Sequence, residues 1–328
     1  PRYESFMGLG PKRIEHWEHW SNPDAETYLA GIDTYAHPRS CRLKLKELYP
    51  QLGLPVPETD DPKPRPEEQA DRGKGRWGDS NRAYWQQEIA SARFVTQDEM
   101  LDFSPLEQGD FTGWRVVVDG DFRSEDVIYE RYRKNYPAEW GDKAPAGSSA
   151  SVSFYNTMFM WPMLVFGYEN FLLMSLDPRF ERIMEEFAEI NRRVYSAFSR
   201  LPINFVVSHD DIVLANGPVC SPAWMRKHIF PRYEEFWGIV KQAGKEVIFM
   251  VDGCVDAFAD DVMACGARGI ISEPFTDYRA IARRYENCFI AGEGDNRVLM
   301  RNDPGEIHTM VETMVETGRM SGGYMMCI

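Results

Sequence analysis

The stretch KEVIFMVDGC, residues 245–254, decides the predicted fold. Its central apolar run, residues 247–251, is typical of a strand that is covered on both faces within a parallel sheet. An aspartate and a cysteine, Asp252 and Cys254, follow at the carboxyl end of this run. Active sites collect at that end of parallel strands because the loops there converge. We therefore expect a functional role for both side chains.

Strand and helix patterns alternate around this stretch through the second half of the chain. The expected strands cover residues 203–207, 245–251, 269–272, 288–291 and 323–327. The expected helices cover residues 221–243, with an interruption at Pro231, and residues 255–265, 276–285 and 304–318. Such alternation is the signature of right-handed crossovers in a parallel sheet. Because no GxGxxG or phosphate loop follows a strand, we expect an α/β fold closed into a (β/α)₈ TIM barrel rather than an open sheet.

The first 150 residues predict a less regular region in front of this pattern. Residues 13–20, RIEHWEHW, fit an opening strand, and residues 114–119 fit another. Residues 54–82 are Pro-rich and charged, as in a long surface loop. We expect a single domain over residues 1–328, with an irregular, extended N-terminal region carrying insertions.

Composition restricts the partners. Lys and Arg number 37 against 51 Asp and Glu, a net charge of −14, which argues against binding to nucleic acid or an anionic membrane surface. The chain shows neither an apolar run of membrane-spanning length nor a leader, so we expect a cytoplasmic protein. The six cysteines are scattered without a CxxC pair, which indicates reduced thiols, a few of them able to bind metal.

Polar side chains lie at the carboxyl end of each expected strand of the second half. They are His209, Asp210, Asp211, Asp252, Cys254, Glu273, Glu293, Asp295 and Cys327. Any one of them could be a helix cap or a loop acid. Five strand ends of this kind together indicate one shared site.

A second apolar feature is the Met- and aromatic-rich segment at residues 157–171. Such a segment predicts core packing or a subunit interface, as in a homodimer. The part near Phe159 is also a candidate contact surface for a partner protein.

The order of these motifs resembles the uroporphyrinogen decarboxylase superfamily, whose fold is a TIM barrel. The resemblance covers the chain from Ile203 onward and is weak before it. The matching pieces are HDDIVLANGPVCSP at 209–222, FP at 230–231, VIFMVDGC at 247–254, AGEGDNRVL at 291–299, DPGEI at 303–307 and GGYMMCI at 322–328.

Two activities compete within that superfamily. The decarboxylase itself carries an arginine-rich motif of the form RQAGR near its amino end, which holds the propionates of a tetrapyrrole. Residues 13–26 read RIEHWEHWSNPDAE here, with Glu15, Glu18 and Asp24 in place of those arginines. Charge complementarity therefore disfavours a carboxylate-rich substrate. A decarboxylase-like lyase without metal is the alternative activity, and a non-catalytic binding barrel is a third.

The other branch contains methyltransferases that work with corrinoid proteins. The chain resembles them at a His-x-Cys motif and at a cysteine near the last strand, which hold zinc in that branch. Carried over, the motif falls on Asp252 and Cys254, and the distant cysteine on Cys327. Aspartate replaces histidine here, and Glu273 or Glu293 could complete the set in place of Cys327. The alternative is that Cys254 and Cys327 are buried, inert thiols.

The resemblance implies a zinc-dependent methyltransferase that demethylates a small O-methyl substrate, such as an aryl methyl ether. The methyl group would pass to the cobalt of a corrinoid (cobalamin) on a separate partner protein, because no DxHxxG motif occurs here. An oxygen-rich ligand set favours an oxygen donor, whose ether oxygen the metal would polarise. His209 or Asp211 would supply a proton to the departing oxygen, with Glu273 and Glu293 as further catalytic candidates.

Aromatic residues would suit an aryl methyl ether by stacking, although each of them is equally compatible with the core. The aromatic candidates include Trp17, Phe154 and Trp161. The residues expected to line the substrate pocket are His16, Glu18, Trp20 and Tyr155.

Overall fold

A computed structural model describes residues 2–10, 14–16, 22–49, 55–65, 93–114, 119–155 and 157–328. Its main sheet has seven strands, all paired in parallel, in the spatial order β1-β9-β8-β7-β6-β3-β2. The strands are β1 (Glu15–His16), β2 (Ser151–Phe154), β3 (Phe205–His209), β6 (Glu246–Met250), β7 (Gly269–Ile271), β8 (Phe289–Ala291) and β9 (Gly323–Met326). The predicted α/β fold with a parallel sheet is confirmed.

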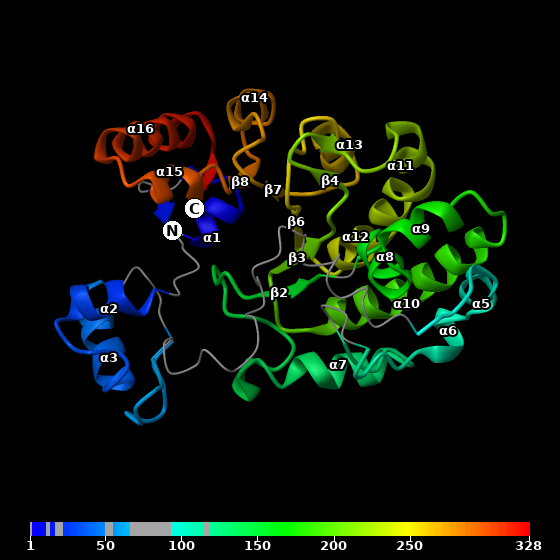
Figure 1. Cartoon of the computed structure of the whole chain (residues 1–328), viewed down its shortest axis with the longest axis horizontal. Helices are drawn as coiled ribbons and strands as arrows, with labels where there is room; N and C mark the ends of the chain where they lie inside the picture. Colours follow the sequence, from blue (N-terminus) through cyan, green and yellow to red (C-terminus); the bar gives the residue numbers. More distant parts are fainter. Residues whose placement is uncertain are drawn as a thin grey trace.

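The strand order is that of a barrel cut open at one place. Neighbours in the sheet follow the order of the chain, and the first strand, β1, pairs with the last, β9. The sheet curves, and helices lie along its outer side (Figure 1). A further strand between β1 and β2 would complete eight. The strand expected at 114–119 falls mainly on residues 115–118, outside the described residues, so closure into an eight-stranded barrel stays a prediction.

The helices of the second half follow the strands. They are α10 (Phe180–Arg200), α11 (Pro222–His228), α12 (Phe230–Gln242), α13 (Ala259–Ala264), α14 (Tyr278–Arg284), α15 (Asn296–Arg301) and α16 (Pro304–Met320). The interruption expected at Pro231 is confirmed, because α11 ends at His228 and Pro231 lies in the first turn of α12, where its missing N–H costs nothing. In the described part of the chain, none of the helices combines the length and apolar character that a membrane crossing needs.

The N-terminal region contains the helix that Asn22-Pro23-Asp24 predicts over residues 25–32, observed as α2 (Pro23–Ala30), and several helices that the sequence did not predict. Its helices are α1 (Arg2–Phe6), α2 (Pro23–Ala30), α3 (Pro38–Leu48), α5 (Gln97–Asp102), α6 (Pro105–Gln108), α7 (Glu125–Arg133) and the 3₁₀ helix η4 (Ala138–Trp140). Several are short and begin at a side-chain cap, such as Asn22, Thr96 and Ser124. Short capped helices leave little apolar periodicity in the sequence, which explains why the region appeared irregular.

Two expected N-terminal features lie partly outside the described residues. Of the loop expected at 54–82, residues 55–65 are described and have no regular helix or strand. Of the opening strand expected at 13–20, the structure shows β1, and residues 17–20 lie outside the described part.

The Met- and aromatic-rich segment belongs to the core, where it forms α8 (Met160–Phe166) and α9 (Tyr168–Met174). Phe159 and Trp161 are fully buried. The Trp161 ring lies 4.8 Å from the ring of Phe122 and 5.6 Å from that of Phe187 on α10, measured between centroids. The expectation of core packing is confirmed. Phe159 itself is enclosed by the rings of Phe171 and Trp224, at 5.0 and 6.3 Å between centroids, so its side chain offers no contact surface. A partner contact elsewhere in the segment stays a prediction.

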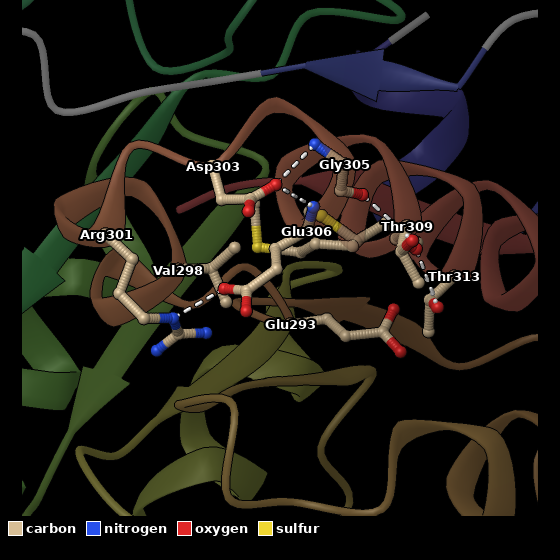
Figure 2. Close-up of a pocket in the computed structure, with 10 residues that line it drawn as sticks. Glu293, Val298, Arg301, Asp303, Gly305, Glu306, Thr309 and Thr313 are labelled. Atoms are coloured by element: carbon tan, nitrogen blue, oxygen red, sulfur yellow. Dashed lines mark hydrogen bonds and ion pairs between the residues drawn. The ribbon is translucent and has the colours of Figure 1, made fainter.

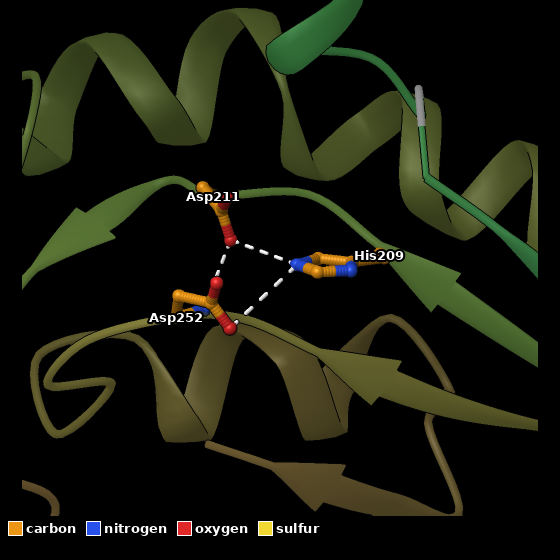
Figure 3. A group of neighbouring side chains, drawn as sticks. All are labelled: His209, Asp211 and Asp252. Atoms are coloured by element: carbon orange, nitrogen blue, oxygen red, sulfur yellow. Dashed lines mark hydrogen bonds and ion pairs between the residues drawn. The ribbon is translucent and has the colours of Figure 1, made fainter. Parts of the chain in front are cut away.

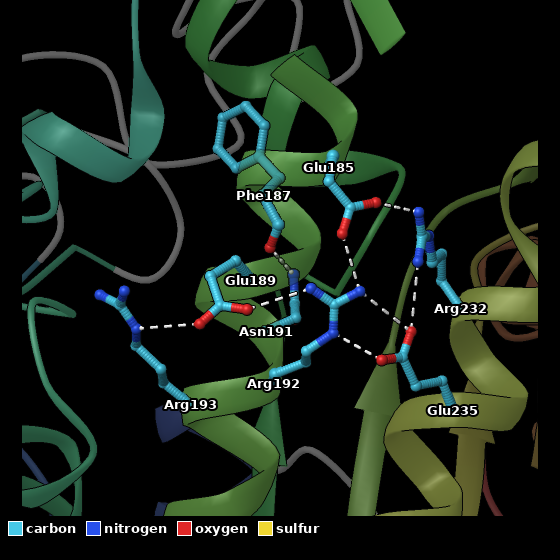
Figure 4. Close-up of polar contacts among 8 residues, drawn as sticks. All are labelled: Glu185, Phe187, Glu189, Asn191, Arg192, Arg193, Arg232 and Glu235. Carbon is cyan, nitrogen blue, oxygen red and sulfur yellow. Dashed lines mark hydrogen bonds and ion pairs between the residues drawn. The ribbon is translucent and has the colours of Figure 1, made fainter. Parts of the chain in front are cut away.

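Helices α10 and α12 pack side by side, and an ion-pair network crosses their outer surface (Figure 4). Arg192 bonds Glu235 at 2.5 Å, Glu185 at 2.9 Å and Glu189 at 3.1 Å. Arg232 pairs with Glu185 and Glu235. The hydrogen bond and charge of Arg192 lower the pKa of Glu235. Each carboxylate of this network therefore meets a cation.

Candidate active site

Two neighbouring strands bring His209, Asp211 and Asp252 together. His209 ends β3 opposite Met250, which ends β6, so the residues after both strands emerge at the same edge of the sheet. The His209 Nε2 atom lies 2.9 Å from Asp211 Oδ1 and 3.9 Å from Asp252 Oδ1, and the backbone N–H of Asp252 donates to Asp211 Oδ1 at 2.9 Å (Figure 3). We call these three residues the mouth cluster.

The mouth cluster has no counterpart elsewhere in the described residues. Within them, it is the only group of three or more His, Cys, Asp or Glu side chains whose ligand atoms all lie within 4.8 Å of one another. Tyr155, which directly follows β2, adds an aromatic wall, because its ring centroid lies 4.2 Å from that of His209. Three adjacent strands therefore contribute to one place.

Asp210 has a different task from its two neighbours in the sequence. Its fully buried carboxylate accepts hydrogen bonds from the backbone N–H groups of Met158, Phe159 and Met160, at 2.8, 2.7 and 2.6 Å, and from the hydroxyl of Tyr233 at 2.7 Å. It thus fastens the segment after β2 to the end of β3. Side chains alternate along an extended chain, so 209 and 211 face one side and 210 the other. That alternation is the sequence signal that separates the three residues.

The electrostatics of the mouth cluster favour an added proton or cation. Burial lowers the pKa of His209, but the hydrogen bond and charge of Asp211 outweigh it and leave that pKa raised. Burial and the neighbouring charge of Asp211 raise the pKa of Asp252 to about 7. Even so, 56% of the Asp252 side-chain surface is exposed, so its carboxylate can be reached from solution.

Glu273 stands beside the mouth cluster. It follows β7, the strand next to β6, and is half-buried. Burial and the charge of Asp211 raise its pKa, while Arg297 lowers it. The guanidinium of Arg297 is held by Asp295 at 2.8 Å and lies over the ring of Phe275. Negative charge therefore predominates around the cluster.

The two cysteines expected as zinc ligands do not join the mouth cluster. The chain turns at Gly253, whose φ of 123° brings the backbone against Leu214, and the N–H of Cys254 donates to the Leu214 carbonyl at 3.0 Å. Burial raises the pKa of the Cys254 thiol, which also interacts with Asp256. Cys327 is half-buried, and its backbone carbonyl accepts a hydrogen bond from the N–H of Gly294 at 3.0 Å. Within the described residues, Asp252, Cys254 and Cys327 thus do not form the expected ligand set.

Glu293 is also held away from the mouth cluster. Thr317 on α16 donates to its Oε1 at 2.9 Å, and Tyr324 on β9 donates to its Oε2 at 2.6 Å. Both partners lie toward α16, where Glu293 lines a cavity. A catalytic role for Glu293 stays a prediction.

The other residues expected in the pocket do not all lie near the mouth cluster. His16 ends β1 opposite Met326, at the same edge of the sheet, and is half-buried. Glu18 and Trp20 lie outside the described residues, as does Trp17. Phe154 and Trp161 are fully buried and belong to the core. Tyr155 is the one expected pocket residue that the described structure places against His209.

The donor atoms of the mouth cluster fit a divalent metal ion. One imidazole nitrogen and two carboxylates are suitable ligands for zinc and for other first-row ions, and three protein ligands leave a position for substrate. Ligand atoms bound tetrahedrally to one zinc ion are about 3.4 Å apart. The separations of 2.9 and 3.9 Å from His209 Nε2 bracket that value.

Comparisons with known proteins support the fold. No family model matches the chain, and no curated protein matches it. Among solved structures, a methyltransferase from Methanosarcina mazei is similar, with a TM-score of 0.51 and 12% sequence identity. The likeness covers 99% of this chain and 91% of that one. At this identity the likeness shows a shared fold.

Proposed function

We propose that this chain is a methyltransferase that moves a methyl group from a small O-methyl substrate, such as an aryl methyl ether, to the cobalt of a corrinoid on a separate protein. The observation that carries the proposal is the mouth cluster, which lies where active sites form in parallel α/β folds. The likeness in fold to a methyltransferase supports it.

The mouth cluster suits the chemistry of ether demethylation. When the methyl carbon is transferred to Co(I), the C–O bond breaks and its electron pair stays on the oxygen. That oxygen needs a proton or a cation in the transition state. Asp252, whose pKa is raised to about 7, can give up a proton near neutral pH and is exposed, and His209, held in orientation by Asp211, can replace that proton.

A metal ion would serve the same oxygen. His209, Asp211 and Asp252 are the residues that would hold it, and zinc bound there would supply Lewis acidity. This set contains oxygen donors and no thiolate, which favours an oxygen methyl donor over a sulfur donor.

The charge around the mouth supports this proposal over a decarboxylase-like lyase. The charge of Asp211, and those of Asp252 and Glu273 in their ionised forms, would repel the carboxylates of such a substrate. An aryl methyl ether carries no such charge, and the ring of Tyr155 offers it a stacking partner.

Metal content and methyl transfer test the proposal together. We expect about one equivalent of zinc in the wild type and in Cys254→Ser, because that thiol is outside the mouth cluster, and at least about ten-fold weaker binding in Asp252→Asn. Methylation of a Co(I) corrinoid protein by an aryl methyl ether is followed by its absorbance. Zinc-free protein with no methyl transfer would overturn the proposal, and turnover of a tetrapyrrole without a corrinoid protein would favour the lyase.

A further inference from the structure

A cavity of about 510 Å³ lies beside α16, apart from the mouth cluster (Figure 2). Its volume is in the range of small-molecule sites. The half-buried Glu293 forms part of its wall, and α15 with the segment after it forms another. The first half of α16 forms the remaining side, and the exposed Arg301 and Glu306 stand at its open rim. The proposed methyl transfer does not use this cavity.

Glu293 faces the cavity with a charge that no ion pair neutralises within the described residues. Its two hydrogen-bond donors, Thr317 and Tyr324, are neutral hydroxyls. The charge of Arg279 acts on it only as a minor influence, and that guanidinium is bonded to Glu316 at 2.6 Å. A half-buried carboxylate in this state gains most from a cation that comes from outside.

The nearby charges add to this preference. Arg301 is tied to Glu306 at 2.5 Å. Asp303 accepts the N–H groups of Gly305 and Glu306, at 2.8 and 3.1 Å, and so caps α16. One arginine stands against three acids around the cavity, counting Glu293.

Threonines on α16 add hydrogen-bond acceptors to the cavity, which Thr309 and Thr313 line. Thr309, Thr313 and Thr317 are spaced four apart on α16 and share one face. Thr309 donates its hydroxyl hydrogen to the Gly305 carbonyl at 2.9 Å, and Thr313 donates to the Thr309 carbonyl at 3.0 Å. Since each hydroxyl has one hydrogen, the oxygens of Thr309 and Thr313 can offer only lone pairs to a ligand.

Apolar side chains complete the cavity. Val298 and Met310 are half-buried and Met314 is fully buried, and all three line it. Thioether side chains adapt to ligands of irregular shape. The cavity therefore combines one carboxylate, acceptor-only hydroxyls and an apolar floor.

We propose that this cavity binds a small aliphatic primary ammonium. The ammonium group donates to Glu293 and to the hydroxyl oxygen of Thr313, which lies one turn of α16 from Thr317, the donor to Glu293. The alkyl chain packs on Met310 and Met314. A primary ammonium supplies three N–H donors and one positive charge. A quaternary ammonium has the charge without donors, and an alcohol has one donor without charge.

Methionine methyl NMR tests the site with three probes: n-butylammonium, tetramethylammonium and 1-butanol. We expect n-butylammonium to shift the ¹³C-methyl signals of Met310 and Met314 saturably, with a Kd of about 1 mM or lower. Tetramethylammonium and 1-butanol should bind at least about ten-fold more weakly. Assignment of the two signals follows from Met310→Leu and Met314→Leu.

Two variants and a control locate the interaction. Glu293→Gln should weaken n-butylammonium by at least about ten-fold, and Thr313→Val should weaken it several-fold while keeping the side-chain shape. Glu312→Gln is the control, because Glu312 is exposed on the same helix and paired with His308 at 3.2 Å, outside the cavity lining. Equal binding of n-butylammonium and 1-butanol, equal binding by Glu293→Gln and Glu312→Gln, or no saturable shift would each overturn the proposal. None of these outcomes depends on methyl transfer.

Discussion

Glutamates on the outer helices and aspartates at the mouth of the sheet have opposite surroundings. At the α10–α12 surface, Arg192 alone bonds three glutamates, and the pKa of Glu235 is lowered. In the mouth cluster, Asp211 and Asp252 lie next to each other, and the pKa of Asp252 is raised. The outer carboxylates are neutralised within the chain, whereas those of the mouth keep their capacity for a proton, a metal ion or a substrate.

This difference indicates that the mouth cluster, and not the outer helices, is the region that lowers the free energy of unfolding. Placing carboxylates together without a cation is unfavourable for folding, and such arrangements gather at functional sites. Ion pairs on helix surfaces are common in structural roles and contribute modestly. Four measurements test whether the two regions differ in this way.

The largest effect should follow from replacing His209. We expect His209→Ala to lower kcat/KM for methyl transfer by about 100-fold or more, because the departing oxygen loses its source of a proton or the metal loses its nitrogen ligand. Arg192→Met is the matched control from the other region, and its kcat/KM should equal that of the wild type. A His209→Ala enzyme of normal activity would remove the mouth cluster from the reaction.

The next effect separates Asp210 from Asp211. Asp210→Asn should reduce the free energy of unfolding by about 3 kcal/mol, because an amide cannot accept from all four donors around that buried position. Asp211→Asn should change it by less than about 1 kcal/mol. Urea unfolding followed by circular dichroism measures both. Equal losses would mean that the two neighbours share one structural role.

A smaller effect is expected at the outer helices. Arg192→Met should lower the free energy of unfolding by about 1 kcal/mol in low salt, because three glutamates lose their common partner. The loss should shrink in about 1 M salt, where the Debye length is about 3 Å. Urea unfolding at both salt concentrations provides the check, and a loss that does not respond to salt would point to packing instead of charge.

The smallest effect concerns pH. A raised pKa in the folded state contributes stability that is fully present below the unfolded pKa and is lost as pH rises to the folded pKa. Metal-free wild type should therefore lose stability as pH rises from about 4 to about 7, between the ordinary aspartate value of 3.8 and the Asp252 value of about 7. Asp252→Asn should flatten this slope. The lowered pKa of Glu235 acts in the opposite direction, and its contribution should disappear as pH falls below the ordinary glutamate value of 4.5. Thermal melts between pH 3 and 9 would show both; an unchanged slope in Asp252→Asn would contradict the assignment.

Much of the fold was predictable because parallel strands buried on both faces appear as apolar runs. Residues 247–251 and 288–291 are examples, observed as β6 and β8. Strand β2 was missed because it has only four residues, SVSF, and an alternation of polar and apolar residues this short gives little signal. The short capped helices near α5 were missed for a similar reason, since single caps carry less signal than periodicity.

The sequence predicted the residues of the mouth cluster individually, but it did not predict which of the strand-end residues lie together. His209, Asp211 and Asp252 were each expected at strand ends, but spacing along the chain does not reveal the turn at Gly253 that separates Cys254 from Asp252. The direction of Glu293 depends on Thr317 and Tyr324, which are distant in sequence. Long-range hydrogen bonds of this kind decide which strand-end residues meet.

The pairing of β1 with β9 has a consequence for biosynthesis. The register joins Glu15 to Met325 and His16 to Met326, so β1 receives this partner only after the whole stretch of chain between them has been synthesised. Contacts between such distant positions slow folding. Until β9 has been synthesised, this edge of β1 stays unpaired in the nascent chain, and an unpaired strand edge is prone to aggregation and to binding by chaperones.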